Sequence, residues 1–309
     1  MKTVISYLRG IPNAKNQEKI DVLKFFVEGV NKCGDKGVVS ENVVWQQSDV
    51  AVLQGFITEH NDKLIKSPHL KLRKSVYENQ LAQNKSTIIA DSNLFLYADP
   101  GNTKHYLRYS INGVFPTTGN YMWDNPDPAR WQSISKNLNL HLKPERQTGK
   151  HILICCQRNG GWSMGGLDVV EWLKQTIKRI RKFSDRPIIV RGHPGDKKAP
   201  TYLRIKLKDK NVKLSVNDHI LDDFKNCWAV VTYNSSPGVA AAIEGIPVFI
   251  TDPVPEVSQA FGVAETELRR LERPYLRDRE KWIEKISMSH WNFEELRSGE
   301  AWRHMQKYV

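Results

Sequence analysis

Two segments carry the strongest structural signal in the chain, RPIIVRGHP at residues 186–194 and AVVTYNSSP at residues 229–237. Each begins with a short apolar, β-branched run that is typical of a buried strand, and each continues into a polar loop with a proline. Ligands of an open α/β sheet bind at the carboxyl ends of its strands, where polar loops and helix N-termini meet. We therefore expect both motifs at that edge of one nucleotide-binding half-domain.

The chain has 309 residues, enough for two domains with separate cores, and 40% of them are hydrophobic. No stretch approaches the roughly 18 consecutive apolar residues of a membrane span, and residues 1–12 lack the apolar core of a signal peptide. The sequence therefore predicts a cytoplasmic protein without a transmembrane segment.

The cysteines and histidines do not form a metal-binding pattern. Of the four cysteines, Cys155 and Cys156 are adjacent in a strand-like run, and their spacing fits neither a disulfide framework nor a metal site. The nine histidines include no H-x-x-x-H pair, and no D-x-D triplet is present to hold a nucleotide-bound cation. We predict reduced cysteines, no essential metal and no tightly bound cofactor.

The net charge of +12 exceeds what solubility requires. Such an excess attracts nucleic acid, an acidic membrane surface or an acidic glycan, although a solvated cationic face is the simpler explanation. Part of the positive charge lies at residues 174–182, on an amphipathic helix, and part at residues 204–213.

Strand and helix patterns alternate along the chain, which predicts an α/β fold with mostly parallel sheets. Expected strands are 3–8, 43–45, 50–54, 86–90, 151–156, 186–190, 229–233 and 248–251, and expected helices are 17–31, 64–84, 167–183, 239–244 and 292–307. We place an N-terminal domain at residues 1–145 and a C-terminal domain at 146–290. The final helix, within 291–309, is expected to pack back on the N-terminal domain.

Residues 100–128 are rich in glycine, proline, asparagine and aromatic residues, with several turn signals. A long irregular segment in a compact protein is usually either functional or disordered, and the aromatic content argues against disorder. We expect a structured loop on the substrate side. The acceptor-binding candidates in and near it are Asn93, Tyr106, Arg108, Tyr121 and Trp123.

The segment 157–166 contains four glycines between a predicted strand and a predicted helix. Glycines allow a diphosphate to approach the backbone, and a helix N-terminus supplies free N–H groups. The segment matches neither a P-loop nor G-x-G-x-x-G, so a plain tight turn is the alternative. The donor-binding candidates here are Arg158, Gly160, Gly161 and Ser163.

The proline after His193 favours an extended backbone that can direct the imidazole into the crevice. This histidine can donate to a phosphate oxygen or stabilise a departing phosphate, unless it only bonds the backbone of its own loop. Arg191 could pair with a phosphate or with a surface carboxylate. Asn234, Ser235 and Ser236 precede a helix that starts at Pro237, so they can cap that helix, bind an anion, or both.

Together these motifs resemble the donor domain of GT-B-fold glycosyltransferases, over about residues 150–255. The His-Pro and Ser-Ser pairs are similar to those of bacterial sialyltransferases and capsule-type Kdo transferases, where they bind the donor's phosphates. The resemblance implies two Rossmann-like domains facing a cleft. The segment 240–248 resembles E-A-x-x-x-G-x-P-V of many such enzymes, but Ala240 replaces the ribose-binding glutamate, and Glu244 is the nearest substitute.

Asp91 follows a predicted buried strand and should lie at the carboxyl edge of the first sheet. Inverting transferases of this fold need a base there to take the acceptor proton. The first domain also resembles, more faintly, phage DNA β-glucosyltransferases, in which an aspartate after such a strand has this role. Asp91 could instead only cap a turn, and Asp99 and Asp124 are the next candidates.

The leading hypothesis is an inverting glycosyltransferase that uses a nucleotide sugar, with UDP-glucose as the donor and 5-hydroxymethylcytosine in phage-type DNA as the acceptor. The cationic composition and the aromatic segment favour DNA, because cations contact phosphates and rings stack beside a flipped base. A phage enzyme of this kind would act in the infected host cell. The alternatives are a capsular or lipid-linked glycan acceptor, and a non-catalytic nucleic-acid-binding protein with the same fold.

Overall fold

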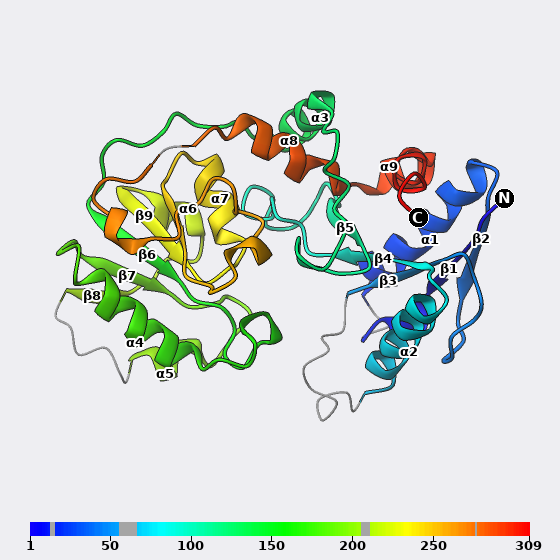
Figure 1. Ribbon diagram of the computed structural model, residues 1–309, viewed down its shortest axis with the longest axis horizontal. Helices are drawn as coiled ribbons and strands as arrows, with labels where there is room; N and C mark the ends of the chain where they lie inside the picture. Colours follow the sequence, from blue (N-terminus) through cyan, green and yellow to red (C-terminus); the bar gives the residue numbers. More distant parts are fainter. Residues whose placement is uncertain (13–15, 56–66, 205–210, 276) are drawn as a thin grey trace. The chain divides into compact units, whose positions relative to one another are not determined.

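The computed structural model describes residues 1–12, 16–55, 67–204, 211–275 and 277–309. These form two compact units, unit 1 with residues Met1–Leu138 and Glu284–Val309, and unit 2 with residues Asn139–Ile283. The sequence placed the corresponding boundaries at residues 145 and 290. Figure 1 shows each unit as a sheet between helices.

Unit 1 contains a six-stranded sheet whose order is β11-β5-β4-β3-β1-β2. The first four strands of the chain are mutually parallel, while β5 runs antiparallel to β4 and β11 antiparallel to β5. The strands are β1 (Thr3–Tyr7), β2 (Lys36–Ser40), β3 (Val50–Gln54), β4 (Ser86–Asp91), β5 (Leu107–Ile111) and β11 (His290–Trp291). The prediction of a mostly parallel sheet is confirmed.

Helices cover both faces of this sheet (Figure 1). One face packs against α1 and the two C-terminal helices, and the other packs against α2, because successive strand residues point to opposite faces. The helices of unit 1 are α1 (Gln17–Lys32), α2 (Pro68–Ala82), α3 (Pro128–Leu138), α9 (Phe293–Ser298) and α10 (Glu300–Met305). The helix α8 (Glu280–Met288) begins in unit 2 and ends in unit 1. The predicted residues 64–66 of the second helix lie outside the described part of the chain.

The predicted C-terminal helix is interrupted by Gly299, which has a φ of +82° and ends α9. The backbones of α1 and α9 approach closely here. A Cβ on Gly29 would lie 2.0 Å from the Leu296 carbonyl oxygen, and one on Gly299 would lie 2.6 Å from the sulfur of Cys33. Two glycines therefore allow the C-terminal segment to pack on α1. This agrees with the predicted return of the C-terminal helix to the N-terminal domain.

His290 in β11 is fully buried in unit 1 and its hydrogen bonds require the neutral ring. Its Nδ1 lies 2.9 Å from the Ile286 carbonyl, to which it must donate, and its Nε2 accepts from the Leu94 N–H at 3.2 Å. Burial lowers the pKa of His290 to about 3, and Arg108 and Arg130 act in the same direction. Protonation of Nε2 would remove the acceptor for Leu94.

We expect unit 1 to lose stability as the pH falls below 6.5. Between the unfolded pKa near 6.5 and the folded value, the unfolded chain binds a proton that the native chain does not. This linkage costs about 2 kcal/mol between pH 6.5 and 5. Urea unfolding at those pH values checks it. His290→Gln, which does not titrate, should show a smaller decrease than wild type, and equal decreases would contradict the assignment.

Unit 2 contains a five-stranded parallel sheet whose order is β10-β9-β6-β7-β8. Since the chain proceeds from β6 outward through β7 and β8, and returns through β9 to β10, the topological switch point lies between β6 and β9. The strands are β6 (His151–Cys155), β7 (Ile188–Arg191), β8 (Val212–Leu214), β9 (Cys227–Thr232) and β10 (Val248–Ile250).

The helices of unit 2 also cover both faces of their sheet, α4 and α5 on one side and α6 and α7 on the other (Figure 1). The amphipathic α4 buries Val169, Leu173 and Ile177 against the strands. The helices are α4 (Val169–Ile180), α5 (Ala199–Arg204), α6 (Ile220–Phe224) and α7 (Pro237–Ile243). No helix in the described residues has the length and apolar character needed to cross a bilayer.

Two predictions of secondary structure were wrong. Residues 43–45 form no strand, and Val43 and Val44 are 67% and 61% exposed, while the second strand lies at 36–40. The segment 100–128, predicted to be irregular, contains β5, all of whose residues are buried. Turn signals surround β5 on both sides and conceal it in the sequence.

Candidate functional site

The loops after β6 and β9 meet at the carboxyl edge of the unit 2 sheet, on either side of its switch point. The N–H of Asn234 donates to Oε1 of Gln157 at 3.3 Å, and its side-chain amide donates to the Ser163 carbonyl at 3.0 Å. Gln157 in turn donates to the Ser163 hydroxyl at 2.8 Å. Because Asn234 and Gln157 are both buried, we interpret them as the residues that join the two loops.

The loop after β7 joins the same network through Asp196. The carboxylate accepts from the N–H of Asn159 at 3.2 Å and from the hydroxyl of Tyr202 at 2.8 Å. Desolvation acts to raise the pKa of Asp196, but the hydrogen bonds from Tyr202 and Asn159 act against it, and the pKa is lowered overall. Three loops that are separate in sequence therefore form one hydrogen-bonded edge.

His193 lies in this edge with one ring nitrogen available to a ligand. Its Nδ1 accepts from the Gly195 N–H at 3.0 Å, so the neutral ring carries its proton on Nε2. Burial and the charge of Arg158 lower the pKa of His193, while Asp196 opposes them. The sequence left open that His193 only bonds the backbone of its own loop. In the structure this backbone hydrogen bond uses Nδ1 alone.

Arg158 and His193 are neighbours over the backbone of Gly195. A Cβ on Gly195 would lie 2.6 Å from Nη2 of Arg158 and 3.1 Å from Cε1 of His193. Arg158 is exposed and makes no ion pair with a residue that the structure describes. A guanidinium and an Nε2–H donor at the end of a parallel strand are suited to bind phosphate oxygens.

The two serines of the second motif have different environments. The Ser235 hydroxyl lies 2.6 Å from that of Thr232, whose oxygen also accepts the Ser235 N–H at 3.2 Å. Ser236 occupies the N-cap position of α7, and Pro237 the first helical position, as the sequence predicted. The Ser236 hydroxyl makes no cap hydrogen bond and the residue is exposed. Its side chain is therefore available to a ligand.

The N-terminus of α4, expected to offer free N–H groups to a diphosphate, is already capped. Asp168 accepts from Val170 and Glu171 at 2.9 Å, and Asn159 accepts from Val169 at 3.1 Å. A carboxylate in this position also repels phosphate. Gly160 has a φ of +65° with no heavy atom near its would-be Cβ, so the structure accounts for it by turn geometry. Gly161 donates within the same turn to Arg158.

Arg191 is fully engaged in holding its own surroundings. Nη1 pairs with the buried Asp223 at 2.5 Å and also donates to the Asn217 carbonyl, and Nη2 donates to the Asp218 carbonyl at 2.6 Å. Asp223 also accepts from Ser215. This geometry supports a role in positioning residues 215–223, and Arg158 is the arginine that remains available beside His193.

Glu244 lies at the opposite end of α7 from Ser236. The helix has seven residues, so the two ends are about 10 Å apart. The Glu244 carboxylate is buried and pairs with Lys143 at 2.5 Å. The structure therefore does not bring Glu244 to the edge that carries His193.

Asp252 belongs to this edge although the sequence interpretation did not include it. Its carboxylate accepts from the Asn234 amide at 2.7 Å, and burial raises its pKa. Beside it, Thr251 accepts from the indole of Trp172 at 2.9 Å. The signal was available, since Asp252 follows the last predicted strand of the sheet by the same rule that identified Asn234.

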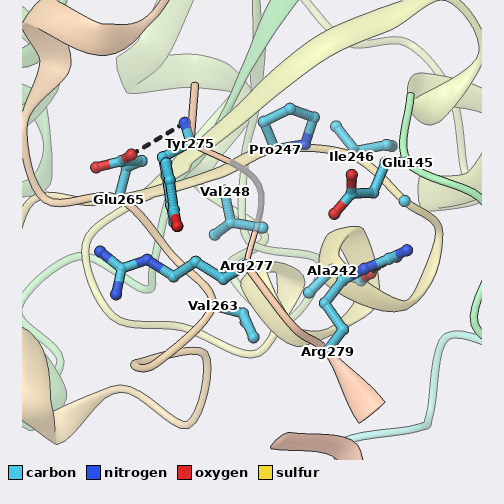
Figure 2. A pocket seen from close by; sticks show the side chains of 11 residues that line it. Glu145, Ala242, Ile246, Pro247, Val248, Val263, Glu265, Tyr275, Arg277 and Arg279 are labelled. Atoms are coloured by element: carbon cyan, nitrogen blue, oxygen red, sulfur yellow. Dashed lines mark hydrogen bonds between the residues drawn. The ribbon is translucent and has the colours of Figure 1, made fainter. Parts of the chain in front are cut away.

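A separate pocket in unit 2 lies at the amino end of β10 (Figure 2). Its arginines are held in place: Arg279 donates to the carbonyls of Ala242 and Lys143, both at 2.7 Å, and Arg277 lies over the ring of Tyr275. Because His193 lies at the carboxyl edge, this pocket is not part of the candidate site.

In unit 1 the last residue of β4, Asp91, lies at the carboxyl edge of the sheet as predicted. It is opposite Arg108 of β5, and Nη2 of Arg108 donates to its Oδ2. The side chain of Asp91 is 27% exposed and that of Arg108 is 8% exposed. The carboxylate is therefore oriented by a buried cation and still accessible.

The structure places most of the expected acceptor residues inside unit 1. Tyr106 is buried and its hydroxyl accepts from Asn137 at 2.9 Å, while Tyr121 is buried under Trp123 with ring centroids 5.0 Å apart. Asn93 is buried in a turn, where it accepts from the Phe95 N–H at 2.8 Å. Buried rings cannot stack on an acceptor, so the aromatic signal of this segment comes mainly from the core.

Trp123 and the two other candidates for the catalytic base, Asp99 and Asp124, lie nearer the surface. Trp123 is half-buried, and its indole nitrogen has no partner among the described residues. Asp99 caps a turn by accepting from the Lys104 N–H at 2.9 Å, and Asp124 is exposed. In the part of the chain that the structure describes, no group of three or more His, Cys, Asp or Glu is arranged to hold a metal ion.

Comparisons with known proteins identify the fold. No protein-family model and no curated protein sequence matches the chain. Among solved structures, the KpsC β-Kdo 2,7 transferase and β-Kdo 2,4 transferase of Thermosulfurimonas dismutans are similar, with TM-scores of 0.54 and 0.56 and identities of 15% and 13%. Each alignment covers 93% of this chain and 89% of the other. A UDP-GlcNAc 2-epimerase of Methanocaldococcus jannaschii matches with a TM-score of 0.34 and 14% identity over 99% of both chains.

The two transferases and the architecture together show a GT-B glycosyltransferase-type fold. Two Rossmann-like units are present, and the C-terminal segment packs on the N-terminal unit. The fold class expected from the His-Pro and Ser-Ser motifs is confirmed.

Proposed function

We propose that this chain is a glycosyltransferase whose unit 2 binds a nucleotide-activated sugar and whose unit 1 binds the acceptor. The observation that carries the proposal is the carboxyl edge of the unit 2 sheet, where three loops are hydrogen-bonded together. At this edge Arg158, His193 and Ser236 can donate hydrogen bonds to a phosphate. This edge flanks the switch point, the usual ligand position in such a sheet. The fold supports the reaction class by analogy.

The proposed reaction is a single displacement that inverts the anomeric centre. The acceptor oxygen forms a bond to the anomeric carbon, and the bond from that carbon to the donor phosphate oxygen breaks, leaving its electron pair on the phosphate. The acceptor proton passes to the carboxylate of Asp91. The Nε2–H of His193 and the guanidinium of Arg158 stabilise the charge that develops on the departing phosphate.

For the sugar, the structural neighbours favour Kdo on a glycan acceptor. Both transferases with TM-scores above 0.5 are named as β-Kdo transferases, and both align over most of this chain. The His-Pro and Ser-Ser motifs point to the same group of enzymes. A glycan acceptor also agrees with the burial of Tyr106 and Tyr121, because buried rings cannot stack on a DNA base.

Transfer of glucose from UDP-glucose to 5-hydroxymethylcytosine in DNA is the second candidate. The observation that favours it is the net charge of +12, which attracts polyanions. Part of that charge, at residues 205–210, lies outside the described residues. Another part of the positive charge lies on the exposed face of the amphipathic helix α4.

Nucleotide release separates these candidates. The purified protein is incubated with CMP-Kdo or UDP-glucose, each with a capsular-type oligosaccharide, hydroxymethylated DNA or unmodified DNA. We expect CMP release that increases with the oligosaccharide. UDP release that requires hydroxymethylated DNA would instead establish the second candidate. No release from either donor, together with tight and salt-sensitive DNA binding, would establish a non-catalytic nucleic-acid-binding protein.

His193→Ala is expected to weaken donor binding about 30-fold, because one hydrogen bond to a charged phosphate contributes about 2 kcal/mol. His193→Gln keeps an N–H near the position of Nε2 and should recover part of the affinity. Titration calorimetry with the nucleotide measures both. Equal affinity of wild type and the alanine variant would make His193 structural.

The same donor affinity should depend on pH. Since the pKa of His193 is lowered in the free protein, an anion bound to its Nε2 favours the protonated ring and raises that pKa. Donor binding should therefore strengthen as the pH falls toward 6. His193→Ala serves as the control, because its donor affinity should lack the pH dependence that comes from the imidazole.

A further inference from the structure

Arg73 on α2 is a buried arginine, and no carboxylate of the described residues is in contact with its charge. The residue is 6% exposed, and its Nε donates to the Gly10 carbonyl at 2.7 Å. Nη1 and Nη2 make no hydrogen bond or ion pair with a described residue. Burial lowers the pKa of Arg73 to about 10, and the charge of Asp91 opposes this only in part. Burying a cation without a partner is costly, so its retention needs an explanation.

The guanidinium lies at the switch point of the unit 1 sheet. Gly10 follows β1 and Gly55 follows β3, and these two strands are adjacent and parallel. The chain leaves β1 through α1 on one face of the sheet and leaves β3 through α2 on the other. The crevice outside such a pair of strand ends is where ligands of open α/β sheets bind.

The backbone around Arg73 is shaped to hold the guanidinium. Gly55 has a φ of +81°, and a Cβ there would lie 2.8 Å from Nη1 and 3.1 Å from Nη2 of Arg73. The N–H of Gly55 continues the ladder to the Ala90 carbonyl at 2.7 Å. The planar group thus rests on the glycine backbone in a fixed orientation, which favours recognition of a planar or tetrahedral oxyanion.

The catalytic candidate of unit 1 lies beside this site. Because the Gly55 N–H bonds the Ala90 carbonyl, Gly55 and Asp91 follow the ends of adjacent strands, which are about 5 Å apart. Arg73 packs against Gly55, and the charge of Asp91 acts on its pKa. Asp91 is already paired with Arg108, whose Nε is buried without a described partner. The pKa of His69 is lowered by burial, by Arg73 and by Lys19, which places further positive charge nearby.

We propose that Arg73 binds an oxyanion of the acceptor, a carboxylate or phosphate group, between the ends of β1 and β3. The bound anion neutralises the buried guanidinium and holds the acceptor next to Asp91. Assigning the anion to the acceptor rests on the proposed function, whereas anion binding at Arg73 does not.

Titration calorimetry with glucuronate, glucose 6-phosphate and neutral glucose tests the site without turnover. We expect the wild type to bind at least one of the two acidic sugars and not glucose, and the acid that binds identifies carboxylate or phosphate as the preferred group. Arg73→Met should weaken this binding tenfold or more. Arg297→Met, which removes an exposed arginine that pairs with Glu28, should leave it unchanged. Wild-type affinity in Arg73→Met would overturn the proposal.

Thermal unfolding separates ligand binding from a structural role. In a zwitterionic buffer with no net charge, Arg73→Met should unfold at the wild-type temperature or above, because it removes a buried cation that has no carboxylate partner among the described residues. A melting temperature several degrees lower would show that the fold itself requires the guanidinium, against the proposal. A failure of all donors to react, with Arg73-dependent anion binding intact, would reject the proposed function alone. Arg73-dependent binding of short DNA in place of acidic sugars would reject the glycan acceptor.

Discussion

Asp91→Asn is expected to reduce sugar transfer roughly 10²- to 10⁴-fold, the usual contribution of a positioned general base. Donor affinity should remain close to wild type, since the donor candidates belong to unit 2 and Asp91 to unit 1. Asparagine keeps an oxygen for Arg108 but cannot take the acceptor proton. Single-turnover transfer and nucleotide titration on the same preparation measure the two effects.

The ion pair with Arg108 complicates this variant, because Asp91→Asn leaves a side chain that is 8% exposed without its carboxylate. The double variant Asp91→Asn with Arg108→Met removes both charges. We expect it to be more stable than Asp91→Asn and equally inactive. If activity returned together with stability, Asp91 would have only a structural role.

The position of the unit 2 site could be predicted because it depends on local sequence. A β-branched run followed by polar residues identifies both a strand and the end at which ligands bind, and this rule places His193, Ser236 and Asp91 at sheet edges. The same rule, applied to the last strand, would have included Asp252.

The partners of these side chains could not be predicted, because they come from distant parts of the chain. Arg158 and Arg191 both adjoin strand ends, yet Asp223 pairs with Arg191 and leaves Arg158 available. Likewise, the capping of α4 by Asp168 decides that its N-terminus does not offer free N–H groups. Such choices depend on tertiary contacts, which periodicity does not report.

Unit 1 was harder to interpret because its core and its irregular segments share the same residue types. Tyr106 and Tyr121 suggested a stacking surface but fill the core instead. Arg73 gave no signal at all, since an arginine in a helix is usually exposed. Its burial results from packing between Gly10 and Gly55, whose strands are separated by α1 and β2 in the sequence.

The return of the C-terminal segment to unit 1 depends on Arg130 of α3. Its Nη2 donates to Oε2 of Glu295 at 2.7 Å, with Nη1 bonded to Oε1, and its Nε donates to the His290 carbonyl at 3.1 Å. The guanidinium also lies 3.9 Å from the ring of Trp291. The side chains of Arg130 and Glu295 are 6% and 11% exposed, so solvent cannot replace either partner.

Arg130→Met is therefore expected to lower the free energy of unfolding of unit 1 by about 3–5 kcal/mol, since it leaves the Glu295 carboxylate buried without its cation. Adding Glu295→Met should recover much of this loss, because an apolar pair avoids the desolvation of two charges. Arg9→Met is the matched control: its pair with Glu41 spans 3.7 Å between side chains that are 57% and 73% exposed. That control should change stability by less than about 1 kcal/mol. Urea unfolding followed by tryptophan fluorescence measures all three, and a loss in Arg130→Met as small as in Arg9→Met would show that packing alone holds the C-terminal segment.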